Sequence, residues 1–573
     1  RVRGLPINLN HRAFESPVGS AIDGIPYIRV EYVTAALYDV SRIEVLRGPQ
    51  GTTFGKNTTA GLIHLLSNTP TDSFSGHVDL QGGSLDRRRL EAAVGGPIVE
   101  GVANFRIAAF NDDLGGFVEN TTHGIYPGAP GEMRGSQRRG ARAKFEIPDI
   151  AGSSLLFDLE HIESLSTGSG AEMYTDSATT RTFLRRYDPK ADFIRGNNIA
   201  SLNDADDRDV TIDIMTAEWH STIGAWNVVG LGGYSAMRST SNLDIDATPA
   251  PILFGTGDDR SPNTTLELRA DTEFEGLFGM DELFGASLGH SSLLTGVFLQ
   301  RRGIGGNGYT LRFGTVAYLG ALAATKGGAL DPLVGLLPQG LLDQVFSLVP
   351  LDAATDHFEA ATQGFDQRSD NAAVFAQSEW SFLPDWSLEL GMRLSRETKT
   401  ASWQQRFTSP PPQILFPLLQ INEFTAEERH SEGQFQPKIT LKYSPVPEMN
   451  VFAHWGRGYR GGGFNAFAYR GSPDELTYGS ETATDWGIDV KGMLFEGAAQ
   501  YNLSFFLLDI DNFQTLTQIA DPNGISIGLS KVENAGKARA QGVEGDFTWR
   551  TTDWMTLFAT AGYNDTRSEE RRV

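Results

Sequence analysis

The stretch QFQPKITLKY at 434–443 has an apolar residue at every second position. Successive side chains of a β-strand point to opposite faces, so this alternation predicts a strand with one apolar and one polar face. The apolar set is Phe435, Pro437, Ile439, Leu441 and Tyr443. The same alternation recurs at 386–395, 543–550 and 555–563. The chain is therefore predicted to contain many two-faced strands.

Short turns separate the candidate strands at one end. They read PIVEG, PDIAG, IGAW, LPDW, VPEM, FEGA and TTDW, at 97–101, 148–152, 223–226, 383–386, 446–449, 495–498 and 551–554. Five of the six stretches between them, of about 45 to 70 residues, are long enough for two strands of about 9 to 13 residues and a long connection, and the stretch 227–382 is longer. A soluble β-sandwich would show a turn about every 8 to 12 residues. The spacing favours an outer-membrane β-barrel with short periplasmic turns and long external loops.

No segment has the run of about 20 apolar residues that a membrane helix requires. The most apolar region, 317–351, is interrupted by charged residues and prolines. A membrane span must therefore consist of strands. Trp386 and Trp554 stand at short turns, where a barrel places its aromatic girdle, although ordinary core tryptophans fit these positions equally well.

From residue 74 onward the sequence contains about 17 candidate strands. Single-chain bacterial barrels have an even number of strands, because an open edge in lipid leaves backbone groups unpaired. The chain also begins at Arg1 without a signal peptide. We therefore expect it to be a partial chain.

Composition limits the possible functions. The 573 residues contain no linker-like tract, which favours one large architecture. The net charge of −23 argues against binding to nucleic acid. Cysteine is absent, which excludes disulfides and thiol catalysis, and the ten histidines lack metal-ligand spacing. No metal or cofactor site is predicted.

The stretch LRGPQGTTFGKNTTAG at 46–61 is a near miss for a phosphate-binding loop. Such a loop needs four residues between its glycines and a hydroxyl after the lysine. Here three residues separate Gly51 from Gly55, and Asn57 stands where the hydroxyl belongs. The following residues are apolar or weak helix formers, whereas a phosphate loop opens a helix. Nucleotide binding is disfavoured, and the protein is not predicted to be an enzyme.

The longer stretch SRIEVLRGPQGTTFGKNTTAGLIHLLSNTPT at 41–71 resembles the plug-domain signature of TonB-dependent outer-membrane receptors. SGHVDLQGGS at 75–84 resembles the first barrel strand of that family. Other segments resemble it in the family's order: RVRG at 1–4, DGIPY at 23–27, GYRGGGFN at 458–465, ETATDWGIDVKG at 481–492 and NAGKARAQGVEGDFTWR at 534–550.

The resemblance implies an all-β fold: a transmembrane antiparallel barrel of 22 strands with an N-terminal plug in its lumen. It divides the chain into the C-terminal part of the plug, 1–73, and a C-terminally incomplete barrel, 74–573. By the same resemblance, we expect this chain to lack the TonB box, the plug-terminal segment that TonB pulls. By resemblance, the protein is a monomer in the lipid of the bacterial outer membrane.

The resemblance also implies active import of a scarce ligand, in the first place a ferric siderophore. The proton-motive force would be delivered by TonB with ExbB and ExbD. The alternatives are a vitamin B12-like or oligosaccharide ligand taken up by the same mechanism, or a passive porin-like barrel. A porin would carry no plug signature, and the same holds for a soluble all-β binding protein.

Two plug arginines, Arg3 and Arg47, match family residues that pair with glutamates on the barrel wall and so act as a latch. Such charge-assisted contacts are specific, yet they can break when the plug is pulled. Glu544 lies on the polar face of its predicted strand and is the expected partner of one arginine. Where relatives have W-E-L-G-x-K, this chain offers Asp485 or Asp489 as the second partner. The alternative is that these carboxylates are hydrated lumen residues.

The plug glycines, Gly48, Gly51, Gly55 and Gly61, are predicted to form turns and close contacts, and Lys56 has no predicted role. The ligand-binding residues are not predicted, but plug apices and external loops are the candidates. The largest expected loop, 303–370, contains a predicted amphipathic helix within 327–349, which either caps the mouth or packs on neighbouring loops. Three arginines of another loop form a candidate basic patch: Arg181, Arg185 and Arg186.

Overall fold

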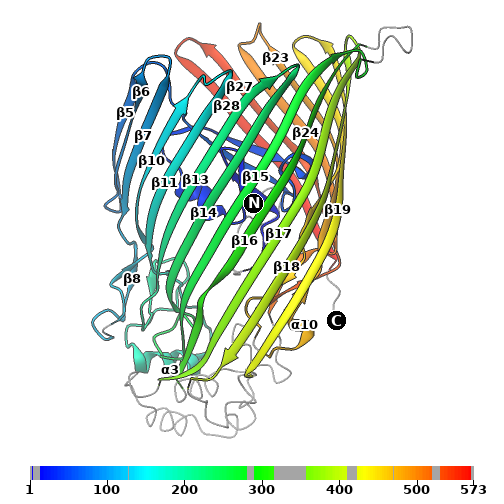
Figure 1. Ribbon diagram of the computed structural model, residues 1–573. Coiled ribbons are helices and arrows are strands. Elements are labelled where there is room, and N and C mark those ends of the chain that lie inside the picture. Colours follow the sequence, from blue (N-terminus) through cyan, green and yellow to red (C-terminus); the bar gives the residue numbers. More distant parts are fainter. Residues whose placement is uncertain are drawn as a thin grey trace.

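The computed structural model describes residues 3, 13–126, 128–279, 289–314, 357–408, 422–468, 470–518 and 530–569. Long tilted strands form the wall of a barrel, and a small sheet lies inside it (Figure 1). The predicted fold class, an antiparallel β-barrel with an N-terminal plug in its lumen, is confirmed.

The plug is a four-stranded sheet of order β2-β1-β4-β3. The central strands β1 and β4 are parallel, and the outer two pair antiparallel with them. Its apolar side chains are buried partly against the barrel wall; the ring of Tyr38, for example, lies 4.5 Å from that of Phe110. The elements are β1 Val18–Ile22, β2 Ile25–Tyr27, α1 Val30–Ala35, β3 Val40–Arg47, α2 Gly51–Phe54 and β4 Gly61–Ser67.

The wall consists of seventeen strands in the described residues, which agrees with the predicted number. Sixteen pairs of neighbouring wall strands are antiparallel with a defined register. The barrel closes between β28 and β5, and for this pair the described residues define no register. Both faces of β5 are exposed. The strands are β5 Ser75–Gly82, β6 Arg88–Val99, β7 Ala103–Leu114, β10 Gly135–Ile147, β11 Ser153–Thr167, β13 Asp207–Ile223, β14 Trp226–Asp244, β15 Leu253–Glu275, β16 His290–Gly314, β17 His357–Leu383, β18 Trp386–Arg406, β19 Phe424–Val446, β20 Met449–Arg460, β23 Glu481–Leu494, β24 Ala499–Asp511, β27 Lys537–Thr552 and β28 Met555–Glu569.

The seven predicted turns all join neighbouring strands, and the four alternating stretches all lie in wall strands. The expected strand length was wrong, because several strands run well past the predicted 9 to 13 residues and β17 has 27. Part of the loop expected at 303–370 is therefore strand, since β16 and β17 stay paired as far as Gly314 and His357. The helix predicted within 327–349 lies outside the described residues.

The strands are long because the wall extends beyond its apolar band. On β18 the outward residues Leu390, Met392 and Leu394 are exposed and apolar, whereas the next outward positions toward the long loops are Arg396 and Thr398. Only the half of the wall next to the short turns therefore suits lipid. None of the helices in the described ranges is long and apolar enough to cross a membrane.

A charge placed in this band should be costly. We expect Leu390→Arg to lower the free energy of unfolding in lipid by about 2 to 4 kcal/mol, as for cations near the bilayer midplane. The matched control is Thr400→Arg, an exposed position of the same strand beyond the apolar band, which should change stability little. Urea unfolding in lipid vesicles measures both, and equal effects would mean that the band is wrongly placed.

Short elements gather at the long-loop end, where α3 and α10 lie in Figure 1. The connection between β20 and β23, residues 461–480, folds back into the barrel mouth. Its Phe464 packs on Trp403 of β18, and the Trp403 ring nitrogen donates to the carbonyl of Asn465 at 2.9 Å. These short elements are β8 Val118–Asn120, β9 Glu132–Met133, α3 Ala178–Tyr187, β12 Ile199–Ala200, β21 Gly463–Phe464, α10 Pro473–Leu476, β22 Thr477–Tyr478, β25 Gln514–Gln518 and β26 Ser530–Asn534.

Candidate functional site at the plug–wall interface

The segment 51–58 reaches from the plug to the barrel wall and contains the near-miss phosphate motif. Gly51–Phe54 forms a single helical turn, α2, that contacts β17 to β20. Three backbone N–H groups of the segment are engaged: Phe54 donates to the carbonyl of Gln50, Gly55 to that of Gly51, and Asn57 to that of Tyr459 on the wall. These N–H groups bind carbonyl oxygens rather than converge on an open cradle, so the segment docks the plug on the wall.

The four glycines singled out in the sequence have different geometries. Gly48, Gly55 and Gly61 have positive φ, at 74°, 78° and 152°, a conformation that costs glycine least. Gly51 is helical, but a side chain there would collide with Gln436 of β19, because an added Cβ would lie 2.0 Å from the amide nitrogen. Gly48 and Gly55 lie in loops of the plug, Gly61 is the first residue of β4, and Gly51 lies where plug and wall approach closely.

Arg3 meets one of the two proposed aspartates. Its Nη1 lies 2.9 Å from Oδ1 of Asp485, and both side chains are buried. The guanidinium also lies 4.1 Å from the ring centroid of Phe506. Asp489 is not in contact with Arg3; instead it lies 3.2 Å from His454, whose other ring nitrogen is 3.0 Å from Asp485.

Arg47 lies 3.3 Å from Glu544, the wall residue expected from strand parity. This pair is more exposed to solvent than the pair of Arg3 and Asp485, since 44% of the Arg47 side chain and 19% of the Glu544 side chain are exposed. Solvent screens such a pair, so its energy is much smaller than that of a buried one. The two arginines thus make contacts of unequal strength on the same side of the lumen.

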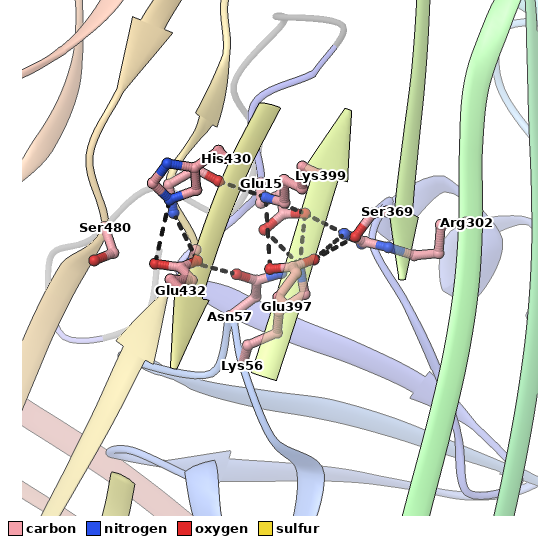
Figure 2. A network of polar contacts seen from close by, with 12 residues as sticks. Glu15, Lys56, Asn57, Arg302, Ser369, Glu397, Lys399, His430, Glu432 and Ser480 are labelled. Carbon is pink, nitrogen blue, oxygen red and sulfur yellow. Dashed lines mark hydrogen bonds and ion pairs between the residues drawn. The ribbon is translucent and has the colours of Figure 1, made fainter. Parts of the chain in front are cut away.

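Lys56, which had no predicted role, lies at the centre of a buried ion cluster (Figure 2). Its Nζ donates to Glu15 of the plug at 2.9 Å and to Glu397 of β18 at 2.6 Å. Two more cations complete the cluster: Arg302 of β16 bonds Glu15, and Lys399 of β18 lies 3.3 Å from it. We call these five residues the Lys56 cluster. They tie two plug segments to two wall strands.

The Lys56 cluster is charged at neutral pH. Burial raises the pKa of Glu15, but Lys399, Lys56 and Arg302 outweigh burial and hold that pKa well below its ordinary value. Burial and the neighbouring Arg302 lower the pKa of Lys56 to about 8, so the lysine remains mostly protonated. Three cations therefore face two carboxylates. Glu432 lies at the margin, 3.6 Å from His430.

The cluster also contacts the mouth. The Lys399 ammonium donates to the carbonyl of Gly462 at 2.6 Å, and the N–H of Gly461 donates to the side chain of Asn57 at 3.3 Å. Farther along the same connection, the hydroxyl of Tyr478 donates to the carbonyl of Ala13 at 3.2 Å. Residues 461–480 are thus bonded both to the plug and to the wall.

Two cavities lie between the plug and the barrel wall. The first, of about 760 Å³, separates the plug from β7 and β10–β17 and is lined by Phe54, His64, Arg106, Lys144 and Glu267 among others. The second, of about 490 Å³, contains both arginine–carboxylate pairs and Asp489. Their wall residues come mostly from the short-turn halves of the strands. Parts of the plug are therefore separated from the wall by cavities, and the second cavity borders both arginine–carboxylate pairs.

The arginines of the predicted basic patch lie on the helix α3 rather than in an irregular loop. The guanidinium groups of Arg181 and Arg185 both lie over the ring of Phe193, at 5.6 and 5.4 Å. In the described part of the chain no group of three or more histidine or acidic residues is arranged to hold a metal ion.

The family model "TonB dependent receptor-like, beta-barrel" matches residues 154–572. A segment of 81 residues is 35% identical to the pesticin receptor of Yersinia pestis, and one of 79 residues is 40% identical to the ferripyoverdine receptor of Pseudomonas aeruginosa. These segments cover 14% and 13% of this chain, and only 12% and 9% of those relatives.

Solved structures of low sequence identity share the fold. The ferric yersiniabactin uptake receptor FyuA from Yersinia pestis aligns with a TM-score of 0.72 at 16% identity, over 99% of this chain and 72% of that one. The siderophore receptor PiuA from Acinetobacter baumannii aligns with a TM-score of 0.69 at 12% identity, over 98% and 73%. With the plug-filled barrel and the family match over most of the chain, these findings lead to one conclusion: the chain belongs to the TonB-dependent receptor-like β-barrel family of bacterial outer-membrane proteins.

Proposed function

We propose that the protein is an energised importer of a ferric siderophore. The observation that carries the proposal is the plug itself, which lies across the lumen and is joined to the wall by buried ion pairs. A lumen occupied in this way does not serve free diffusion, so a ligand passes only if the plug moves. The same observation disfavours a passive porin-like barrel.

The names of the similar proteins support the substrate class. They are receptors for ferric yersiniabactin, for ferripyoverdine and for siderophores. A vitamin B12-like or oligosaccharide ligand would use the same mechanism and stays the alternative. The cations of α3 at the long-loop end are compatible with an anionic ligand.

In this proposal residues 1–73 form the plug domain and residues 74–573 the barrel domain. Arg3 with Asp485, and Arg47 with Glu544, serve as the latch, and Gly48, Gly51, Gly55 and Gly61 shape the plug loops. TonB, together with ExbB and ExbD, would break these contacts by pulling on the plug. The importer would act as a monomer and not as an enzyme.

Uptake by whole cells tests the substrate class. Cells that carry the receptor gene and a deletion strain are given iron-55 complexes of catecholate, hydroxamate and mixed siderophores, and separately labelled vitamin B12 and oligosaccharides. We expect the deletion to abolish uptake of one ferric siderophore class. Loss of B12 or oligosaccharide uptake alone would overturn the substrate assignment but leave the mechanism standing.

A further inference from the structure

Arg393 of β18 points into the lumen where segment 51–58 meets the wall. Its side chain is buried, with 1% of the residue exposed. The guanidinium lies 4.9 and 5.3 Å from the ring centroids of Phe298 and Phe375. On the plug side it packs against Gly55, where an added Cβ would lie 3.2 Å from Cζ. This cation is enclosed between two aromatic rings and the plug backbone.

Arg393 differs from the other buried arginines in having no carboxylate partner. The described ranges contain six buried arginines, and in five of them a guanidinium nitrogen lies within 4.0 Å of a carboxylate: Arg3 with Asp485, Arg106 with Asp39, Arg142 with Glu160, Arg302 with Glu397 and Arg460 with Glu481. Within those ranges no carboxylate comes so close to Arg393. Glu267, the nearby acid, binds Arg269 at 3.0 Å.

The hydrogen bonds of Arg393 do not compensate for the missing carboxylate partner. Its Nη1 donates to the carbonyl of Thr53 at 3.4 Å, which is long, and its Nε has no partner among the described residues. A buried charge is strongly unfavourable unless it is paired and hydrogen-bonded. Cation–π contacts recover only part of the lost hydration. A negative charge next to the guanidinium would therefore stabilise this site.

A cavity of about 30 Å³ lies directly beside this guanidinium. Its lining includes Arg393, Asn371, Gln300 and Arg302. Asn371 is also buried, and its side-chain oxygen has no partner among the described residues. The oxygen and nitrogen of an amide are interchangeable in such an assignment, so this side chain can equally present its NH₂ group to the cavity. Apolar side chains such as Ile28 and Leu62 complete the lining, and Arg393 is its one cation without a carboxylate partner in the described residues.

We propose that this cavity is a binding site for a small monovalent anion of halide size, held by Arg393 and Asn371. The volume admits one or two water-sized solutes and excludes a siderophore. A bound anion would neutralise the buried guanidinium and fasten segment 51–58 to the wall next to the Lys56 cluster, since Lys56 and Arg302 also line this cavity. The proposal concerns the resting plug and does not depend on what the barrel transports.

Bromide is a direct probe, because it scatters anomalously at its absorption edge. Crystals of the purified protein grown in sodium bromide should show an anomalous peak between Arg393 and Asn371. The peak should vanish in Arg393→Met and persist in the control Arg47→Met, which removes a lumen arginine that lines the cavity of about 490 Å³ instead. A cavity without a peak in the wild-type protein, or a peak that survives Arg393→Met, would overturn the assignment.

A solution measurement keeps the proposal testable if Arg393→Met does not crystallise. The melting temperature of the wild-type protein should rise with sodium bromide above its value in sodium gluconate of equal ionic strength. Asn371→Leu keeps the arginine and should need about tenfold more bromide for the same shift, as expected for the loss of one hydrogen bond to a charged partner. Equal melting curves in both salts would contradict the site.

Discussion

Glu397→Gln should destabilise the docked plug by about 3 to 5 kcal/mol, the usual cost of breaking a buried ion pair from one side. In the wild-type protein Glu397 accepts from Lys56 at 2.6 Å and from Ser369. Without its charge, three buried cations would face Glu15 alone. The free energy of opening is measured by hydrogen exchange at the amides of β1 and β4, which should lose protection while the wall strands keep theirs.

Lys56→Met is the matched comparison within the same cluster. It leaves Arg302 and Lys399 facing Glu15 and Glu397, a balanced set of two cations and two carboxylates. We expect a smaller effect, of about 1 to 2 kcal/mol, from the lost charge-assisted hydrogen bonds. If Lys56→Met lost as much hydrogen-exchange protection as Glu397→Gln, the charge balance of the Lys56 cluster would not determine how firmly the plug is docked there.

Arg3→Met should have the other large effect, of about 2 to 3 kcal/mol, because it removes a buried charged hydrogen bond and leaves Asp485 with His454, 3.0 Å away, as its partner. The barrel contains its own control, since Arg47→Met removes the equivalent charge from the exposed pair with Glu544. That change should weaken plug docking by no more than about 1 kcal/mol.

The same exchange experiment measures this pair of variants. Protection at β4 should fall far more in Arg3→Met than in Arg47→Met. Equal losses would show that the two contacts hold the plug equally, in conflict with their unequal burial. Unchanged protection in Arg3→Met would remove Arg3 from the latch.

The wall could be predicted from the sequence because its signals are local. Alternation of period two is visible within one strand, and a turn such as LPDW at 383–386 is complete in four residues. Parity also indicated which side of β27 faces the lumen, and Glu544 indeed lies beside Arg47. Strand length was not predictable in this way, since outward residues beyond the lipid band are polar and resemble a loop.

The Lys56 cluster could not be predicted, because its members are far apart in the chain. Lys56 and Glu397 are separated by 341 positions, and only the register of the wall brings them together. One partial signal is present in the sequence: the polar face of 386–395 continues through Glu397 and Lys399, although the strand predicted from the alternation ends at residue 395. Which plug residue they meet depends on the docking of the plug, which has no local pattern.

Uptake of the ferric siderophore with and without TonB distinguishes an energised importer from a passive barrel. Cells carrying the full receptor gene are loaded with the iron-55 complex at 0 °C and warmed, in a wild-type strain and in a strain that lacks TonB. The account predicts equal binding of the complex in both strains and internal iron only where TonB is present. Equal accumulation of internal iron in both strains would contradict an importer in which TonB moves the plug.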